Sequence, residues 1–167
     1  PTRAIGEEWC RDADPLVDGE LLNVAGLALE IVATPGHTTD SMSILITDDG
    51  SLLTGDTVLG RGTTVIAWPD GVLGPYLDSL ARIRELVLEG VAVRFLPGHG
   101  PIVDEPLPFI DFYLEHREER LDQVRAALAG GASTPLEVVE IVYADVDKVL
   151  WGAAEMSVRA QLDYLQA

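Results

Sequence analysis

Thr34-Pro35-Gly36-His37-Thr38, Gly55-Asp56 and Pro97-Gly98-His99-Gly100 are the three segments that decide the fold of this chain. Each of them follows an apolar run with the length and composition of a β-strand, at residues 27–33, 51–54 and 91–96. A sheet that places the ends of these strands side by side brings His37, Asp56 and His99 to one point. His and Asp side chains are ligands of zinc-like ions, and a catalytic site holds such ligands on rigid elements with an open position for water.

The residues around these segments have the pattern of an α/β domain, in which several strands are followed by a helix and another strand. The first 20 residues show no sustained period and are expected to form an irregular lead-in. Apolar residues recur at three- and four-residue steps after Pro75, which can occupy the first position of a helix. The expected elements are a hairpin of residues 21–24 and 27–33, strands at 41–47, 51–54 and 91–96, and a helix between Pro75 and Gly90.

Only helical patterns follow, so we place a domain boundary near residues 105–108 and expect two units, 1–105 and 106–167. One long helix carries apolar residues at three- and four-residue steps and ends at Gly130-Gly131. A second helix begins at a capping box, Thr134-Pro135-Leu136-Glu137, and a third carries Ala154, Val158, Leu162 and Leu165 on one face.

The composition limits the function classes. The 167 residues include 28 acidic and 11 basic side chains, a formal net charge of −17. Nucleic acids and anionic membranes are therefore disfavoured as partners, because their binding needs clustered Lys and Arg. A small anionic substrate stays possible, because a bound metal reverses the local field.

The compartment is expected to be the cytoplasm. Cys10 is the only cysteine, so the chain can form no disulfide within itself, which favours a reducing environment. No apolar stretch is long enough to span a bilayer. The sequence begins at Pro1 and reads as the interior of a longer protein, whose true N-terminus is not visible.

The three decisive segments resemble the later motifs of the metallo-β-lactamase superfamily. Residues 55–64, together with His116-Arg117, resemble more narrowly the lactamase-β-2-like branch, whose members carry a winged-helix-like unit at the C-terminus. The resemblance implies an α/β fold that is half of an αββα sandwich, followed by a small helical winged-helix-like unit.

By this resemblance, His37 binds one metal ion, His99 binds a second, and Asp56 bridges the two and is catalytic. The ions are two divalent cations, usually zinc and in some members manganese or iron. The implied activity is that of a binuclear-metal hydrolase, in which metal-bound hydroxide attacks an ester, a thioester or a phosphodiester.

The first motif of the family, His-x-His-x-Asp-His, is absent, because the only histidines are His37, His99 and His116. The resemblance assigns the missing ligands to a preceding half of the domain. We therefore expect the parent to be the enzyme, and this chain alone to be inactive with partial or no metal occupancy. One face of its sheet is expected to be apolar and covered by the missing half or by a second copy.

Other residues have competing interpretations. Thr63 and Thr64 either line the substrate pocket or begin an edge strand. Trp68 and Trp151 are expected to be packing residues. His116 and Arg117, which lie among Glu115, Glu118 and Glu119, are expected to form a solvated ion-pair face.

Two further functions stay open beside hydrolysis of a small-molecule or ester-type substrate. The lactamase-β-2-like branch includes endonucleases that cut single-stranded RNA, although the acidity of this chain opposes that activity. A non-catalytic interaction or dimerisation module is the other alternative. In that case the helical tail docks a protein, because residues 153–167 hold only Arg159 against Glu155 and Asp163.

Overall fold

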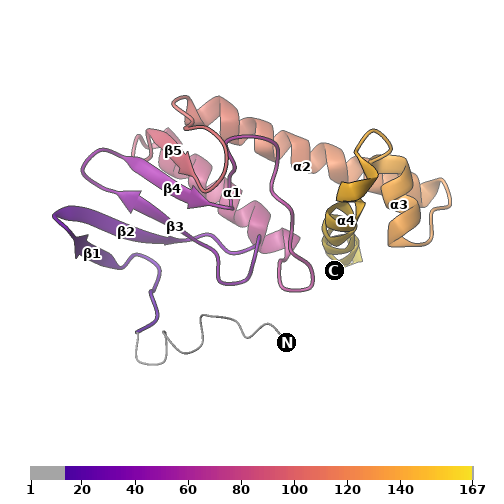
Figure 1. The fold of residues 1–167 in the computed structure, drawn as a ribbon, viewed down its shortest axis with the longest axis horizontal. Helices are drawn as coiled ribbons and strands as arrows, with labels where there is room; N and C mark the ends of the chain where they lie inside the picture. The colour runs from indigo at the N-terminus through magenta and orange to yellow at the C-terminus, as the bar shows by residue number, and fades with distance from the viewer. Residues whose placement is uncertain (1–13, 167) are drawn as a thin grey trace.

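The computed structural model describes residues 14–166 and contains one five-stranded sheet followed and covered by helices (Figure 1). The strands lie in the sheet in the order in which they occur along the chain. Neighbouring strands from β1 to β4 are antiparallel, and β5 is parallel to β4. The strands are β1 (Leu21–Val24), β2 (Leu27–Ala33), β3 (Met42–Ile46), β4 (Ser51–Gly55) and β5 (Arg94–Pro97).

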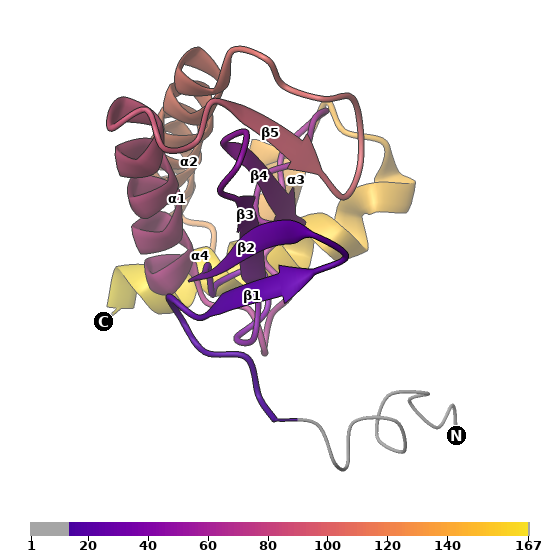
Figure 2. The same cartoon turned by 90° about the vertical axis from the view of Figure 1, so that its left-hand side faces the viewer.

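The connection from β4 to β5 passes through the helix α1 (Leu73–Leu88), and α2 (Pro106–Ala129) follows β5. Figure 2 shows α1 and α2 side by side on one face of the sheet. Neighbouring parallel strands need a crossover connection of this kind. The face of the sheet that α1 and α2 cover forms the hydrophobic core. Its centre is made of side chains that are fully buried: Leu52, Phe95, Tyr76, Leu80, Ile83, Ile110 and Tyr113.

The opposite face of the sheet is also apolar. The strand register places Ile44 beside Ile31 and Leu53, and Leu53 beside Leu96. Ile44, Leu53 and Leu96 are only partly buried, and within residues 14–166 neither of the two hydrophobic clusters includes them. This surface, with Ile44 and Leu53 at its centre, is called the open sheet face below.

A smaller helical unit stands at the C-terminal end of α2. It consists of α3 (Pro135–Val142), the 3-10 turn η1 (Lys148–Leu150) and α4 (Trp151–Gln166). The last turns of α2 supply Val124 and Ala127 to its hydrophobic cluster, whereas Ile110 and Tyr113 of the same helix belong to the cluster under the sheet. α2 therefore joins both parts of the protein, and the division at residue 105 stays a prediction.

The structure confirms the expected fold class, and most elements lie where the sequence pattern puts them. The strand expected at 91–96 begins later, at Arg94, because the amides of Val91 and Ala92 donate to the carbonyl of Leu86 in α1. Trp68 and Trp151 pack at the edges of the two clusters, as expected. Cys10 and the first part of the lead-in lie outside the described residues. No helix within residues 14–166 combines the length and apolarity that a membrane crossing requires.

Candidate metal centre

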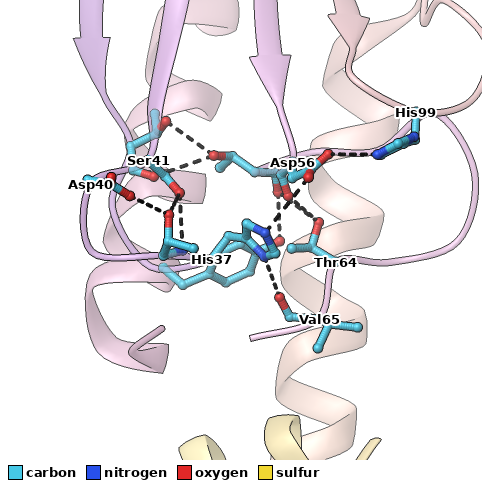
Figure 3. A network of polar contacts seen from close by, with 11 residues as sticks. His37, Asp40, Ser41, Asp56, Thr64, Val65 and His99 are labelled. Atoms are coloured by element: carbon cyan, nitrogen blue, oxygen red, sulfur yellow. Dashed lines mark hydrogen bonds and ion pairs between the residues drawn. The ribbon is translucent and has the colours of Figure 1, made fainter. Parts of the chain in front are cut away.

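The three residues selected from the sequence lie together at one end of the sheet. Figure 3 shows His37 and His99 directed at Asp56 from two sides. His37 Nε2 is 3.8 Å from Asp56 Oδ2, and His99 Nε2 is 3.6 Å from Asp56 Oδ1. Each imidazole thus faces a different oxygen of the same carboxylate.

The three side chains differ in exposure. His37 is 24% exposed and Asp56 41%, whereas His99 is 76% exposed on its loop after β5. The site therefore lies at the surface of this chain, with its open side next to His99.

The imidazole of His37 is held by a backbone group. Its Nδ1 lies 2.7 Å from the carbonyl oxygen of Val65. A carbonyl oxygen only accepts hydrogen bonds, so Nδ1 carries the proton, and in the neutral ring Nε2 presents a lone pair. That lone pair is directed toward Asp56, which is the arrangement by which an outer contact orients a histidine ligand.

Two glycines allow the loops to approach each other closely. Gly36 has φ +136°, and a Cβ there would overlap the backbone of Tyr76 at the start of α1. A Cβ on Gly98 would lie 3.1 Å from Asp56 Oδ1, and the Gly98 amide donates to the carbonyl of Gly55 at 2.9 Å. The turn before His37 therefore requires glycine, whereas at Gly98 a side chain would crowd the Asp56 carboxylate.

Buried hydroxyl groups join the loops beneath the site. Thr34 Oγ1 lies 3.0 Å from Ser43 Oγ, and Thr57 Oγ1 donates to Thr34 Oγ1 at 3.2 Å. Thr64 Oγ1 donates to the carbonyl oxygen of Asp56 at 2.7 Å. These contacts link the end of β2, the strand β3 and the loop after β4, which fixes the backbone on both sides of the site.

Three side chains from the helices hold the loop that follows Asp56. Tyr76 donates its hydroxyl to the carbonyl of Thr57, and the hydroxyl of Tyr113 accepts from the amide of Leu59 and lies within 3.2 Å of its carbonyl. Arg117 donates to the carbonyl of Thr64. Burial raises the pKa of both tyrosines, that of Tyr113 to about 12, so both hydroxyls keep their protons at neutral pH.

The expected solvated face at His116 and Arg117 is wrong for Arg117. Its side chain is 3% exposed and its guanidinium lies over the ring of Tyr76, with 4.9 Å between Cζ and the ring centroid. The buried ring and the carbonyl of Thr64 compensate the charge. The signal was in the sequence, because position 117 is in phase with Tyr113, Leu121 and Val124 on the buried stripe of α2.

His116 is half-buried beside it, and Nδ1 makes no hydrogen bond to the described residues. Burial, together with the nearby charges of Arg117 and Arg120, lowers the pKa of His116 to about 4. The ring is therefore neutral at pH 7.

The edge-strand interpretation of Thr63 and Thr64 is wrong, because residues 63–67 pair in no strand. Thr64 is buried and its hydroxyl binds the backbone of Asp56 and Thr57. Both threonines also line a cavity between this loop and the helices, so their role in binding substrate stays a prediction.

His37, Asp56 and His99 provide donor atoms that suit metal ions with further ligands from elsewhere. Two ligand atoms on one zinc ion, each at about 2.0–2.2 Å, lie less than about 4.4 Å apart. The separations of 3.6 and 3.8 Å satisfy this limit and exceed the length of a hydrogen bond. Within residues 14–166, however, no three His, Cys, Asp or Glu side chains are placed so that they could hold a single metal ion together. This chain alone therefore offers two pairs of donors that share one carboxylate.

Comparison with known proteins gives two family matches. The sequence profile of the Metallo-beta-lactamase superfamily matches residues 8–99, and that of the Beta-lactamase associated winged helix domain matches residues 134–167. Beta-lactamase-like protein 2 homolog of Drosophila melanogaster is 33% identical over 155 residues, which are 91% of this chain and 50% of that protein. Atrochrysone carboxyl ACP thioesterase of Aspergillus fumigatus is 33% identical over 140 residues, with 77% of this chain and 42% of that protein covered.

Comparison with a solved structure also finds a metallo-beta-lactamase family protein. A metallo-beta-lactamase family protein of Thermus thermophilus superimposes with a TM-score of 0.79 at 28% identity, over 91% of this chain and 48% of that one. The chain thus spans half or less of the length of these relatives.

Proposed function

The chain belongs to the metallo-beta-lactamase superfamily, and from this premise we propose that it is the C-terminal portion of a binuclear-metal hydrolase. The observation that carries the proposal is the position of Asp56 between His37 and His99, with one imidazole facing each carboxylate oxygen. A carboxylate with two free oxygens is suited to a position between two cations, because it contacts both and offsets their charge.

Each of the three residues has a defined part in this proposal. His37 binds one ion through Nε2 and is kept in the correct tautomer by Val65. His99 would hold the other ion, and Asp56 would contact both through its two carboxylate oxygens. Two divalent ions held by these residues would supply hydroxide at neutral pH and Lewis acidity toward the scissile bond. The hydrogen bonds from Thr64 to the carbonyl of Asp56 and from Gly98 to the carbonyl of Gly55 hold the backbone that carries this carboxylate.

The substrate that we favour is a thioester. The thioesterase of Aspergillus fumigatus is 33% identical to 77% of this chain and supports this choice. A single-stranded RNA substrate is less compatible with the net charge of −17, because the phosphate backbone is bound through Lys and Arg.

The remaining ligands, in this proposal, come from a preceding half of the domain that packs on the open sheet face. Two facts support this partner. The chain spans about half the length of its relatives, and Ile44 and Leu53 leave an apolar surface on the sheet. A half that supplies both ligands and a cover for these residues satisfies both facts.

The test is hydrolysis by the full-length protein, loaded with zinc, of two probes: an N-acetylcysteamine thioester and bis(p-nitrophenyl) phosphate. We expect turnover of the thioester, and we expect Asp56→Asn to lower kcat to the detection limit while circular dichroism and melting temperature stay near the wild-type values. The matched control is Asp104→Asn, because Asp104 is an exposed carboxylate near the His99 loop. Hydrolysis of neither probe, or an unchanged kcat in Asp56→Asn, would contradict the proposal.

A further inference from the structure

A cavity of about 380 Å³ lies between the loop after Asp56 and the helices α2 and α4. Thr64 and Val65 connect it to the candidate metal centre. Both line the cavity, while the hydroxyl of Thr64 binds the backbone of Asp56 and the carbonyl of Val65 binds His37. A molecule in the cavity therefore touches the same short segment that supports two of the proposed ligands.

The charge of the cavity is opposite to that of the chain. Its lining includes His116, Arg117 and Arg120, and of the described residues that line it none is acidic. The whole sequence holds 28 acidic residues against 11 basic ones. Two arginines and no carboxylate are among the described lining residues, so the cavity is basic although the protein as a whole is acidic.

The guanidinium groups in this wall are only partly paired. Arg117 is 3% exposed, and its Nε, which always carries a hydrogen, makes no hydrogen bond to the described residues. The buried Nδ1 of His116 also makes no hydrogen bond to the described residues. Arg120 lies over the ring of Tyr143, and its hydrogen bonds to Gln123 and Val142 use Nη1 only. Both of these unpaired atoms are buried, so the donors left for a ligand are the other N–H groups of Arg117 and Arg120, since Nη2 of Arg117 and Nη1 of Arg120 already have partners.

We propose that this cavity is an oxyanion-binding subsite that takes a phosphate or carboxylate group of the substrate. The volume lies in the range of small-molecule sites, about 300–1,000 Å³, which favours one anionic group over a nucleic-acid strand. Guanidinium groups bind phosphates and carboxylates through paired N–H donors. The inference rests on the proposed function only in assigning the anion to the substrate, and the site itself is independent of the metal ions.

The test is a nuclear magnetic resonance titration of the histidine rings in the full-length, zinc-loaded protein. The probes are methyl phosphate and acetate, with sodium chloride at matched ionic strength as the background. We expect at least one oxyanion to shift the His116 resonances with saturation, whereas chloride does not. The stronger of the two responses distinguishes a phosphate from a carboxylate as the natural group. Binding at the metal ions is recognised separately, because it moves His37 and His99.

The variants form a matched pair on one helix. Arg120→Gln removes a charge from the cavity wall and is expected to weaken the apparent affinity at His116 by about tenfold or more. Arg125→Gln removes the same charge from an exposed position of α2, where Arg125 pairs with Asp122, and is expected to leave the affinity within about twofold. Equal effects of the two variants would overturn the inference.

Two further outcomes separate this inference from the proposed function. If His116 responds to neither oxyanion in the wild-type protein, or only to a single-stranded RNA oligonucleotide, the subsite is contradicted whatever the variants do. If His116 responds as expected but the protein hydrolyses neither probe, the proposed hydrolase is contradicted and the oxyanion site stands.

Discussion

The hydroxyl of Tyr113 connects the core of the protein to the loop that carries Asp56. It accepts from the Leu59 amide at 2.8 Å and lies 3.2 Å from the Leu59 carbonyl and 3.1 Å from that of Gly62. The ring itself is fully buried in the core under the sheet. One side chain therefore both packs the core and fixes the residues after the proposed bridging ligand.

Replacing Tyr113 by Phe should lower the free energy of unfolding by about 1–3 kcal/mol, because the part-buried Leu59 amide loses its acceptor. Urea denaturation of the full-length protein measures the loss. Tyr164→Phe is the matched control, because Tyr164 is 41% exposed and no hydrogen bond to its hydroxyl occurs among the described residues. A loss no larger than that of the control would show that the Tyr113 hydroxyl does not stabilise the loop.

At the scale of single residues, the sequence was informative about the metal-ligand candidates and much less so about their supports. His37, Asp56 and His99 stand in motifs with glycine and proline at strand ends, so their convergence could be predicted. The sequence predicts the wrong environment for Arg117, because its charged neighbours Glu118 and Glu119 indicate a surface position. The phase of the helix placed it in the core, and only the three-dimensional structure shows the carbonyl and the ring that compensate its charge.

Among the secondary-structure elements, α3 has the clearest local sequence signal. The Thr34 to Gly36 turn depends on distant groups such as Tyr76, whereas the start of α3 depends only on neighbours in sequence. Thr134 accepts from the amide of Glu137, and the Glu137 carboxylate accepts from the amide of Thr134. Hydrogen bonds from the amide and hydroxyl of Ser133, together with that from the Thr134 amide, lower the pKa of Glu137 below its usual range. This local origin is why the beginning of α3 could be predicted to the residue.

Thr134→Ala should destabilise the helical unit by about 1 kcal/mol, because the Glu137 amide loses its acceptor. Thr134→Ser keeps the hydroxyl and should stay within a few tenths of a kcal/mol of the wild type. Thermal denaturation of the three proteins provides the comparison. An equal loss in the Ala and Ser variants would mean that the methyl group of Thr134, and not the cap, stabilises α3.

At the scale of the whole molecule, the two faces of the sheet differ in how far they are buried. α1 and α2 bury one face, while Ile44, Leu53 and Leu96 on the other are only partly buried. An apolar surface of this kind normally marks an interface. The fold class could be predicted from the order of strands and helices, but the extent of this face depends on the register of the strands, which sequence patterns do not give.

If the open sheet face needs a cover, the 167-residue chain produced alone should associate as its concentration rises. Ile44→Lys should suppress the association, because a charge at the centre of the face opposes burial. Sedimentation velocity measures the effect, and Leu88→Lys is the matched control, since Leu88 is 55% exposed on α1. A chain that stays monomeric at all concentrations, or one whose association Leu88→Lys abolishes equally, would exclude this face as the interface.

The central claim is that His37, Asp56 and His99 bind metal ions, and the metal content of the purified full-length protein tests it most directly. Elemental analysis should find about two transition-metal ions per wild-type chain, as expected for a two-metal site. His37→Ala and His99→Ala should each lower the content to about one ion or less. His116→Ala replaces the remaining histidine and should keep the wild-type value. Two tightly held ions in all three variants would contradict the account.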